Sequence, residues 1–271
     1  MRAALIAVLV FIALPDLAAQ GPPPASNWSV TLGGGAVVVP RHSGSDEHRI
    51  VPIPFSHVTY RGRVYVGPSS AGVGGGLGAY VIRTSRFGLA AELGVLEDRP
   101  ARRSNALAGT TDRDLLATAG ASLSYHAGPV QGTLTVARGL NDGAGLLGTA
   151  RLALVRPVVR RLIVTTDVSA TFADARQMRR EFGVTEAEAI RRRALIAAGD
   201  PRLRPDEGSA YRPDGGPQQI GGSVSLLYVM SQRWSVLGFG GVGRLTDRAV
   251  ASPLVRQREQ VSGGIGLMWR R

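Results

Sequence analysis

Apolar residues alternate with small or polar residues at every second position along most of this chain. In residues 115–126 one face carries leucine, alanine and tyrosine, whereas the other carries threonine, glycine, serine and histidine. A period of two is typical of β-strands, because successive side chains point to opposite faces of the sheet. Two-faced segments of about ten residues or more are typical of strands that cross a membrane as part of a barrel. The alternation therefore favours an all-β fold.

Twelve segments are candidate strands. They are residues 27–39, 49–60, 63–68, 72–82, 86–96, 113–126, 129–138, 146–156, 160–172, 219–230, 233–245 and 257–269. Bacterial single-chain barrels have an even number of strands, and twelve fits. Segment 63–68 is short and segment 146–156 alternates poorly, so a barrel of ten strands is the alternative.

The connections between these segments alternate in length. The odd-numbered connections are 40–48, 69–71, 97–112, 139–145, 173–218 and 246–256, and five of these six are long. The even-numbered connections are 61–62, 84–85, 127–128, 157–159 and 231–232, and all five are short. Outer-membrane barrels place long loops outside the cell and tight turns in the periplasm. We therefore predict a transmembrane antiparallel β-barrel and disfavour a soluble β-sandwich, which has no reason to sort its loops in this way.

The first residues resemble an export signal. Arg2 precedes an apolar run from Ala3 to Leu14, and small residues follow at Ala18 and Ala19. This order is typical of a cleaved secretory signal peptide. We expect residues 1–19 to be the signal peptide and residues 20–271 to form the barrel in the outer membrane of a Gram-negative cell.

Composition excludes several kinds of chemistry. The chain has no cysteine, which rules out thiol catalysis and cysteine-bound zinc. All 32 basic residues are arginine, so a lysine Schiff base and a P-loop lysine are also ruled out. The formal net charge is +12, and for an exported protein this favours anionic membrane lipid over nucleic acid as the partner.

Most of the acidic and histidine residues near the N-terminus lie in one stretch. His42, Asp46 and His48 share the first external loop, and His57 lies in the next strand, on the order of 30 Å from His48 at about 3.4 Å per residue. A single metal ion therefore cannot bind both His48 and His57. A weak surface metal site formed by His42, Asp46 and His48 is the alternative to an ordinary solvated loop, which we favour. We assign no catalytic, cofactor-binding or metal-binding residue.

Two further motifs have a structural interpretation. Residues 238–243 satisfy the G-x-G-x-x-G pattern, but no helix is predicted after them, so a glycine-rich barrel strand is favoured over a dinucleotide site. Thr185 and Glu188 form a capping box that predicts a short helix in the longest loop. We expect Arg191, Arg192 and Arg193 on this helix to be solvated, with contact to lipopolysaccharide phosphates as the alternative.

Some side chains are expected at particular places in the barrel. The residues expected near the strand ends, where membrane proteins concentrate aromatic residues, are Trp28, Tyr60, Tyr65, Tyr125, Trp234 and Trp269. Arg86, Glu92 and Asp167 are expected in the lumen, because a charge facing lipid is costly. They would form either an internal ion-pair network or the lining of a small-solute pore.

Three stretches resemble the MipA/OmpV family of MltA-interacting outer-membrane proteins. The first is SGSDEHRIVPIPFSHVTYRGRVYVGP, residues 43–68, in which the matching positions are Gly44, Ser45, Asp46, Glu47, Arg49, Pro52, Pro54 and Tyr60. The second is EFGVTEAEA, residues 181–189, and the third is residues 233–269 with their closing glycine-rich strand. The family ends in an aromatic-x-Phe strand, whereas this chain ends Met268-Trp269-Arg270-Arg271.

The resemblance implies an outer-membrane β-barrel without cofactor or catalytic activity. It implies a scaffold that holds a murein-degrading lytic transglycosylase near a peptidoglycan synthase, a penicillin-binding protein. A small-solute channel and a surface adhesin are the alternatives. The partners expected from the sequence are outer-membrane lipid, lipopolysaccharide and these two enzymes.

Overall fold

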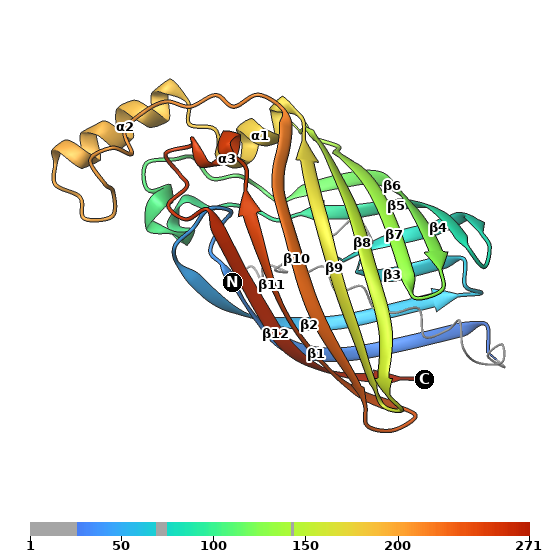
Figure 1. Ribbon diagram of the computed structural model, residues 1–271. Helices are drawn as coiled ribbons and strands as arrows, with labels where there is room; N and C mark the ends of the chain where they lie inside the picture. The colour runs from blue at the N-terminus through green and yellow to red at the C-terminus, as the bar shows by residue number, and fades with distance from the viewer. Residues whose placement is uncertain (1–25, 69–74, 142–143) are drawn as a thin grey trace.

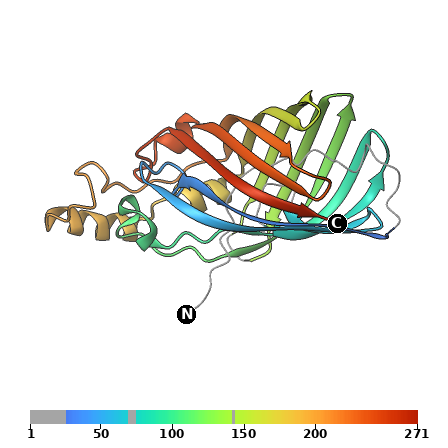
Figure 2. The same ribbon diagram turned by 90° about the horizontal axis from the view of Figure 1, so that it is seen from below.

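Strands that are apolar on one face and small or polar on the other can bury all their backbone hydrogen bonds in a membrane only by closing into a cylinder. The chain does this. In a computed structural model that describes residues 26–68, 75–141 and 144–271, twelve antiparallel strands form a closed barrel (Figures 1 and 2). Each strand pairs with its neighbours in sequence, and β1 pairs with β12 to complete the ring. The expected signal peptide lies outside the described residues.

The strand bounds are as follows: β1 Trp28–Pro40, β2 His48–Tyr60, β3 Val64–Pro68, β4 Gly75–Arg83, β5 Phe87–Leu96, β6 Leu116–Ala127, β7 Val130–Gly139, β8 Leu146–Val159, β9 Leu162–Ala173, β10 Gly216–Val229, β11 Trp234–Leu245 and β12 Glu259–Arg270. Twelve strands is therefore the correct prediction and ten is wrong. The short β3 is a full member of the sheet, because it pairs with both β2 and β4.

The alternation separates a lipid face from a lumen face. On β6 the side chains of Leu123 and Tyr125 are exposed on the outside, whereas Thr118 and Ser122 are buried inside the barrel. The predicted faces of β12 are also confirmed, with Val261, Ile265 and Leu267 exposed and Gln260 buried. No helix in the described part of the chain is long and apolar enough to span a membrane.

All the helices of the described residues lie at one end of the barrel (Figure 1). They are α1 Ala175–Phe182, α2 Glu186–Ala197 and α3 Asp247–Val250, with two short 3-10 turns, η2 Ala101–Arg103 and η3 Asn105–Leu107. The helix predicted from the capping box is α2, whereas α1 and α3 were not predicted. At the opposite end the strands are joined by tight turns, such as 128–129 and 160–161. The predicted alternation of loop lengths is confirmed, apart from the connection at 69–74, which lies outside the described residues.

Aromatic side chains gather near the end with the short turns. Trp28 contacts Tyr60 with ring centroids 4.6 Å apart, and Phe87 contacts Tyr125 at 4.8 Å, with the rings tilted in both pairs. Trp234 and Trp269 are register partners on β11 and β12. Tyr65 was expected in this belt, but it is buried inside the barrel, because on β3 it alternates with the exposed Val64 and Val66.

The seam between β1 and β12 depends on glycine. Gly35 lies opposite Gly266, and a Cβ atom on Gly35 would overlap the Ile265 carbonyl oxygen and lie 2.8 Å from Gly266 Cα. Real Cβ atoms do not approach backbone atoms so closely. The neighbouring Gly34 faces outward, where a Cβ would meet nothing closer than the Ile53 oxygen at 3.9 Å. Glycine at position 35 therefore permits the two end strands to approach closely.

Candidate functional site at the external mouth of the barrel

Helix α1 begins directly where β9 ends. Asp174 caps it by accepting a hydrogen bond from the Gln177 backbone N–H at 2.8 Å. This cap turns the chain sharply at the end of β9, so that α1 packs against β8 and β9. The apolar side chains of α1, Met178 and Phe182, are fully buried.

These two side chains form the centre of a cluster that joins distant strands. Its members are Leu96 of β5, Leu116 of β6, Ala144, Leu147 of β8, Ala173 of β9, Leu245 of β11 and Ala249 of α3, together with Met178 and Phe182. In a closed barrel β5 and β11 lie on different sides of the ring. The cluster therefore crosses the external mouth, and α1 acts as an apolar plug there. We call this set of residues the mouth plug.

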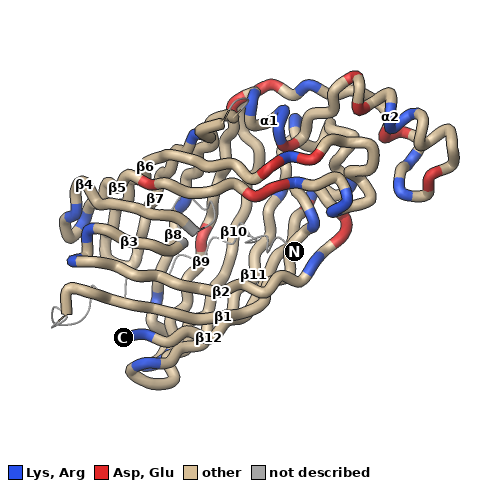
Figure 3. The backbone as a smooth tube through the Cα atoms, turned by 180° about the vertical axis from the view of Figure 1, so that it is seen from behind, with Lys and Arg blue, Asp and Glu red and all other residues tan. Residues whose placement is uncertain are grey.

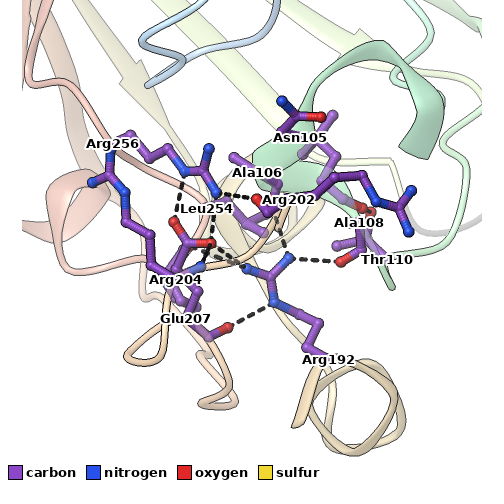
Figure 4. Close-up of polar contacts among 12 residues, drawn as sticks. Asn105, Ala106, Ala108, Thr110, Arg192, Arg202, Arg204, Glu207, Leu254 and Arg256 are labelled. Atoms are coloured by element: carbon purple, nitrogen blue, oxygen red, sulfur yellow. Dashed lines mark hydrogen bonds and ion pairs between the residues drawn. The ribbon is translucent and has the colours of Figure 1, made fainter. Parts of the chain in front are cut away.

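Arg192 ties three loops together above the mouth plug (Figure 4). Its guanidinium donates to the carbonyl oxygens of Glu207 at 2.7 Å, Ala106 at 2.8 Å and Ala108 at 2.9 Å. It also reaches the Pro253 oxygen at 3.4 Å. The prediction that Arg192 is solvated is wrong, since its side chain is fully buried. Arg191 and Arg193, which flank it, are exposed as expected.

The carboxylate of Glu207 completes this network. It accepts two hydrogen bonds from Arg256, at 2.6 and 2.8 Å, and lies 3.6 Å from Arg192. Both charges are buried, and a buried ion pair is tolerated when further hydrogen bonds satisfy its remaining groups. The Arg192 side chain therefore fixes loops 97–115, 174–215 and 246–258 relative to one another. We call these loops, with loop 41–47, the cap.

Glu188 on α2 is a second buried anchor. Its side chain caps its own helix by accepting from the Thr185 backbone at 2.9 Å, and it accepts from the backbone and hydroxyl of Thr111 at 2.8 and 2.6 Å. Burial would raise the pKa of Glu188, but these donors from Thr111 and Thr185 outweigh it and lower the pKa to about 2. The carboxylate therefore remains charged at any physiological pH.

The loop with the candidate metal ligands belongs to the cap. His42 is buried and its Nε2 donates to the Leu254 carbonyl oxygen at 3.1 Å. Burial, and then the nearby arginines 99, 103, 256 and 49, lower the pKa of His42 to about 3, so the ring is neutral. Asp46 instead pairs with Arg204 at 3.1 Å. Within residues 26–68, 75–141 and 144–271, no group of three or more histidine, aspartate or glutamate residues is placed to hold a metal ion.

Two of the three charged residues expected in the lumen are there. Glu92 is buried and accepts from Tyr65 at 2.5 Å and from Ser122 at 2.9 Å. Asp167 is buried and pairs with Arg151 at 2.8 Å. Arg86 has the parity of Glu92 but lies in the turn before β5, where it is exposed at the end of the barrel. The lumen below the mouth plug therefore combines these charged groups with buried apolar side chains such as Leu227, Leu237 and Met268. The glycine-rich residues 238–243 form part of β11, as predicted.

Comparison with solved structures shows similarity to other outer-membrane barrels at very low identity. OmpT, an outer membrane protein of Vibrio cholerae, is 7% identical over 90% of this chain and 98% of its own, with a TM-score of 0.37. The NanC porin is 8% identical over 89% and 98%, with a TM-score of 0.41. A bacterial polysaccharide outer membrane secretin is 11% identical over 92% and 100%, with a TM-score of 0.43. No curated protein sequence matches the chain.

The family comparison covers nearly all of the chain. The profile described as MltA-interacting protein MipA matches residues 32–271, from the first strand through the last. The matched region includes the cap, the mouth plug, most of β1 and all of β2 to β12. The chain therefore belongs to the MipA family of outer-membrane β-barrel proteins.

Proposed function

We propose that the protein is a non-enzymatic scaffold of the outer membrane, which binds a murein-degrading lytic transglycosylase at its periplasmic end and holds it near a peptidoglycan synthase. The observation that supports this role most directly is the mouth plug. Met178 and Phe182 are fully buried among residues from several sides of the barrel. A barrel with its external mouth filled in this way is poorly suited to steady diffusion of solutes. Membership of a family named for interaction with MltA agrees with the proposal.

The periplasmic end offers a charged surface for such a partner. The exposed arginines in or beside its turns include Arg61, Arg63, Arg86, Arg160, Arg161 and Arg233. No carboxylate of the described residues forms an ion pair with any of these six. In Figure 3 acidic residues are concentrated near the cap. The turns are short, so the contact would rest on charge complementarity with an acidic surface of the enzyme.

Affinity capture tests this proposal. The purified barrel should enrich the lytic transglycosylase from solubilised envelopes relative to an unrelated barrel. The double variant Arg160→Glu, Arg161→Glu should reduce the enrichment about tenfold or more, because like charges now face each other. Arg191→Glu, which changes an exposed arginine of the cap, is the matched control and should leave it unchanged. Equal recovery on the unrelated barrel would refute the scaffold.

A gated small-solute channel is the second candidate, because the lumen below the mouth plug carries Glu92, Asp167 and Arg151. Conductance of single barrels in planar bilayers separates the two roles. For a scaffold, the wild type should remain closed and Phe182→Ala should open it, because truncation removes the largest side chain of the mouth plug. Ile190→Ala, at an exposed position of α2, is the control. Steady, solute-sensitive conductance of the wild type would favour the channel.

A further inference from the structure

A shallow apolar groove runs along the outer face of the barrel at the seam between its first and last strands. Its larger part has a volume of about 640 Å³ and is lined by Leu32, Gly33, Gly34, Trp234, Leu267 and Trp269. A second part of about 310 Å³ continues it past Ala36, Val236 and Ile265. The two parts share Gly34 and Leu267, so they form one depression across β1, β12 and β11.

The groove exists because glycine backbone forms its floor while larger side chains form its edges. Gly34 faces outward with open space beyond it, as its missing side chain would meet nothing closer than 3.9 Å. The flanking Leu32 and Leu267 are 44% and 42% exposed and stand on either side. Trp234 and Trp269 lie opposite each other at the end nearest the short turns. The groove is thus open to the membrane and is bounded by aromatic rings at the periplasmic interface.

The length of the groove matches one lipid leaflet. From Trp269 to Ile265 the β12 strand rises about 14 Å at about 3.4 Å per residue. Because barrel strands are tilted by about 40°, this corresponds to roughly 10 Å of membrane depth. A single leaflet contributes about half of the roughly 30 Å hydrocarbon core. One acyl chain that starts at the tryptophan pair would therefore occupy the groove for most of its length.

Three arginines lie at the interfacial end of this groove. Arg233 directly precedes Trp234, and Arg270 and Arg271 follow Trp269. The strands hold them together, because the Arg270 backbone N–H donates to the Arg233 carbonyl oxygen at 2.8 Å and the Arg271 N–H donates to the Val30 oxygen at 2.9 Å. All three side chains are exposed. Arg271 pairs with Val30 and lies on the lipid face with Trp269, whereas Arg270 lies on the lumen face with Met268, because successive side chains of a strand alternate. Among the described residues none of them forms an ion pair.

We propose that this seam is a binding site for one anionic phospholipid of the periplasmic leaflet. An acyl chain lies in the groove between Leu32 and Leu267, and the phosphate is bound by the guanidinium groups of Arg233 and Arg271. Arginine suits this role because its planar fork of N–H donors matches phosphate oxygens. The site is at the membrane face of the barrel and does not depend on the proposed scaffold function.

The tryptophans of the chain make the site directly measurable. All three lie near the seam, since Trp234 and Trp269 line the groove and Trp28 begins β1. Bromine atoms on an acyl chain quench the fluorescence of tryptophans that they contact. The barrel is refolded into vesicles of phosphatidylcholine that contain increasing fractions of brominated phosphatidylglycerol or brominated phosphatidylcholine. We expect brominated phosphatidylglycerol to give half-maximal quenching at a lipid fraction at least fivefold lower than brominated phosphatidylcholine. Each arginine near the headgroup should strengthen binding of the anionic lipid by about fivefold.

Two pairs of variants distinguish a built site from general lipid contact. Arg233→Gln with Arg271→Gln should remove the preference for phosphatidylglycerol, whereas Arg86→Gln with Arg160→Gln, which changes turn arginines away from the groove, should keep it. Gly34→Leu should fill the groove and weaken quenching by both lipids. Gly132→Leu is its control, because Gly132 also has open space around its missing side chain but lies on β7.

The outcomes are decisive in either direction. Equal quenching of the wild type by the two brominated lipids would overturn the proposal, as would an equal loss of preference in the Arg86 and Arg160 control. Each variant is first checked for a faster gel mobility when unheated, which reports a folded barrel. If the arginine variant fails this check, the wild-type comparison of the two lipids still decides.

Discussion

Three consecutive arginines on α2 have different environments, and helix geometry explains why. Successive residues of a helix are about 100° apart, so Arg192 shares the face of Glu188 and Ala189, which are both buried, while Arg191 and Arg193 point away. The sequence supplies this spacing, and the alanine at 189 is a signal that this face packs inward. Burial of Arg192 was nevertheless unpredictable, because its partners are backbone carbonyls from loops at residues 106, 108 and 253.

Replacing Arg192 tests its role as the tie between loops. Arg192→Met leaves the Ala106 and Ala108 carbonyl oxygens and the Glu207 carboxylate without this donor, so we expect the cap to lose roughly 3 to 5 kcal/mol of stability. Amide hydrogen exchange in residues 97–115 and 174–215 measures the loss. Arg193→Met, which gives up one bond to the Gly208 oxygen at an exposed position, should change it by less than about 1 kcal/mol. Equal losses of cap stability in the two variants would contradict the role of Arg192 as the residue that holds the loops together.

The low pKa of Glu188 predicts how the cap responds to acid. A carboxylate with a pKa of about 2 in the folded state and 4.5 when unfolded stabilises the fold above pH 4.5. This contribution, on the order of 3 kcal/mol, is lost as the pH falls from 4.5 towards 2. Glu188→Gln should remove the dependence. The measurement is the difference in cap stability between wild type and variant from pH 7 to pH 3, which should stay constant down to about 4.5 and then shrink.

The strands could be predicted from the sequence because each strand lies between lipid on one face and the lumen on the other, and this gives its apolar residues a period of two. Lipid outside and a packed lumen inside select opposite side chains at alternate positions, and this pattern is visible without knowing any partner. The largest shifts in the strand ends are about three residues, as in β6, expected from residue 113 and beginning at Leu116. Helix α2 carries its own start signal in Thr185 and Glu188. Helix α1 was missed because it spans eight residues, three of them arginine, and its burial depends on side chains from five strands.

Barrel closure should be weakened by a side chain at Gly35 but not by one at the neighbouring Gly34. Gly35→Ala places a methyl group against the β12 backbone, so we expect a loss of roughly 1 to 3 kcal/mol in folding stability. Gly34→Ala faces open space and should change it by no more than about 0.5 kcal/mol. The gel mobility of unheated samples after refolding in increasing urea reports both. A seam that tolerates alanine equally at both positions would mean that close strand approach is unimportant there.

The whole molecule has ends of different character. The end with the cap carries paired carboxylates and arginines, whereas the opposite end carries short turns with exposed arginines (Figure 3). The total charge of +12 can be read directly from the sequence, whereas its distribution depends on which end of the barrel each connection reaches. The loop-length rule resolves this once the strands are placed.

Thiol labelling on intact cells tests the orientation. The chain contains no cysteine, so each single substitution introduces a unique thiol. Ala187→Cys at an exposed position of α2 should react with a membrane-impermeant maleimide, and Gln232→Cys in the turn between β10 and β11 should react only after the outer membrane is disrupted. Labelling of both in intact cells, with a periplasmic marker protein unlabelled, would contradict the proposed topology.

The mouth plug also constrains the order of assembly. The loop between β11 and β12 supplies Leu254 to the apolar core of the cap, a carbonyl oxygen to Arg192, and the Ser252 hydroxyl that donates to the Phe182 oxygen at 2.6 Å. These contacts come from the last hairpin of the chain, so the external mouth cannot be fully sealed until that hairpin is in place. An incomplete barrel would therefore have an open mouth, and we expect it to conduct ions until the final strand has been added.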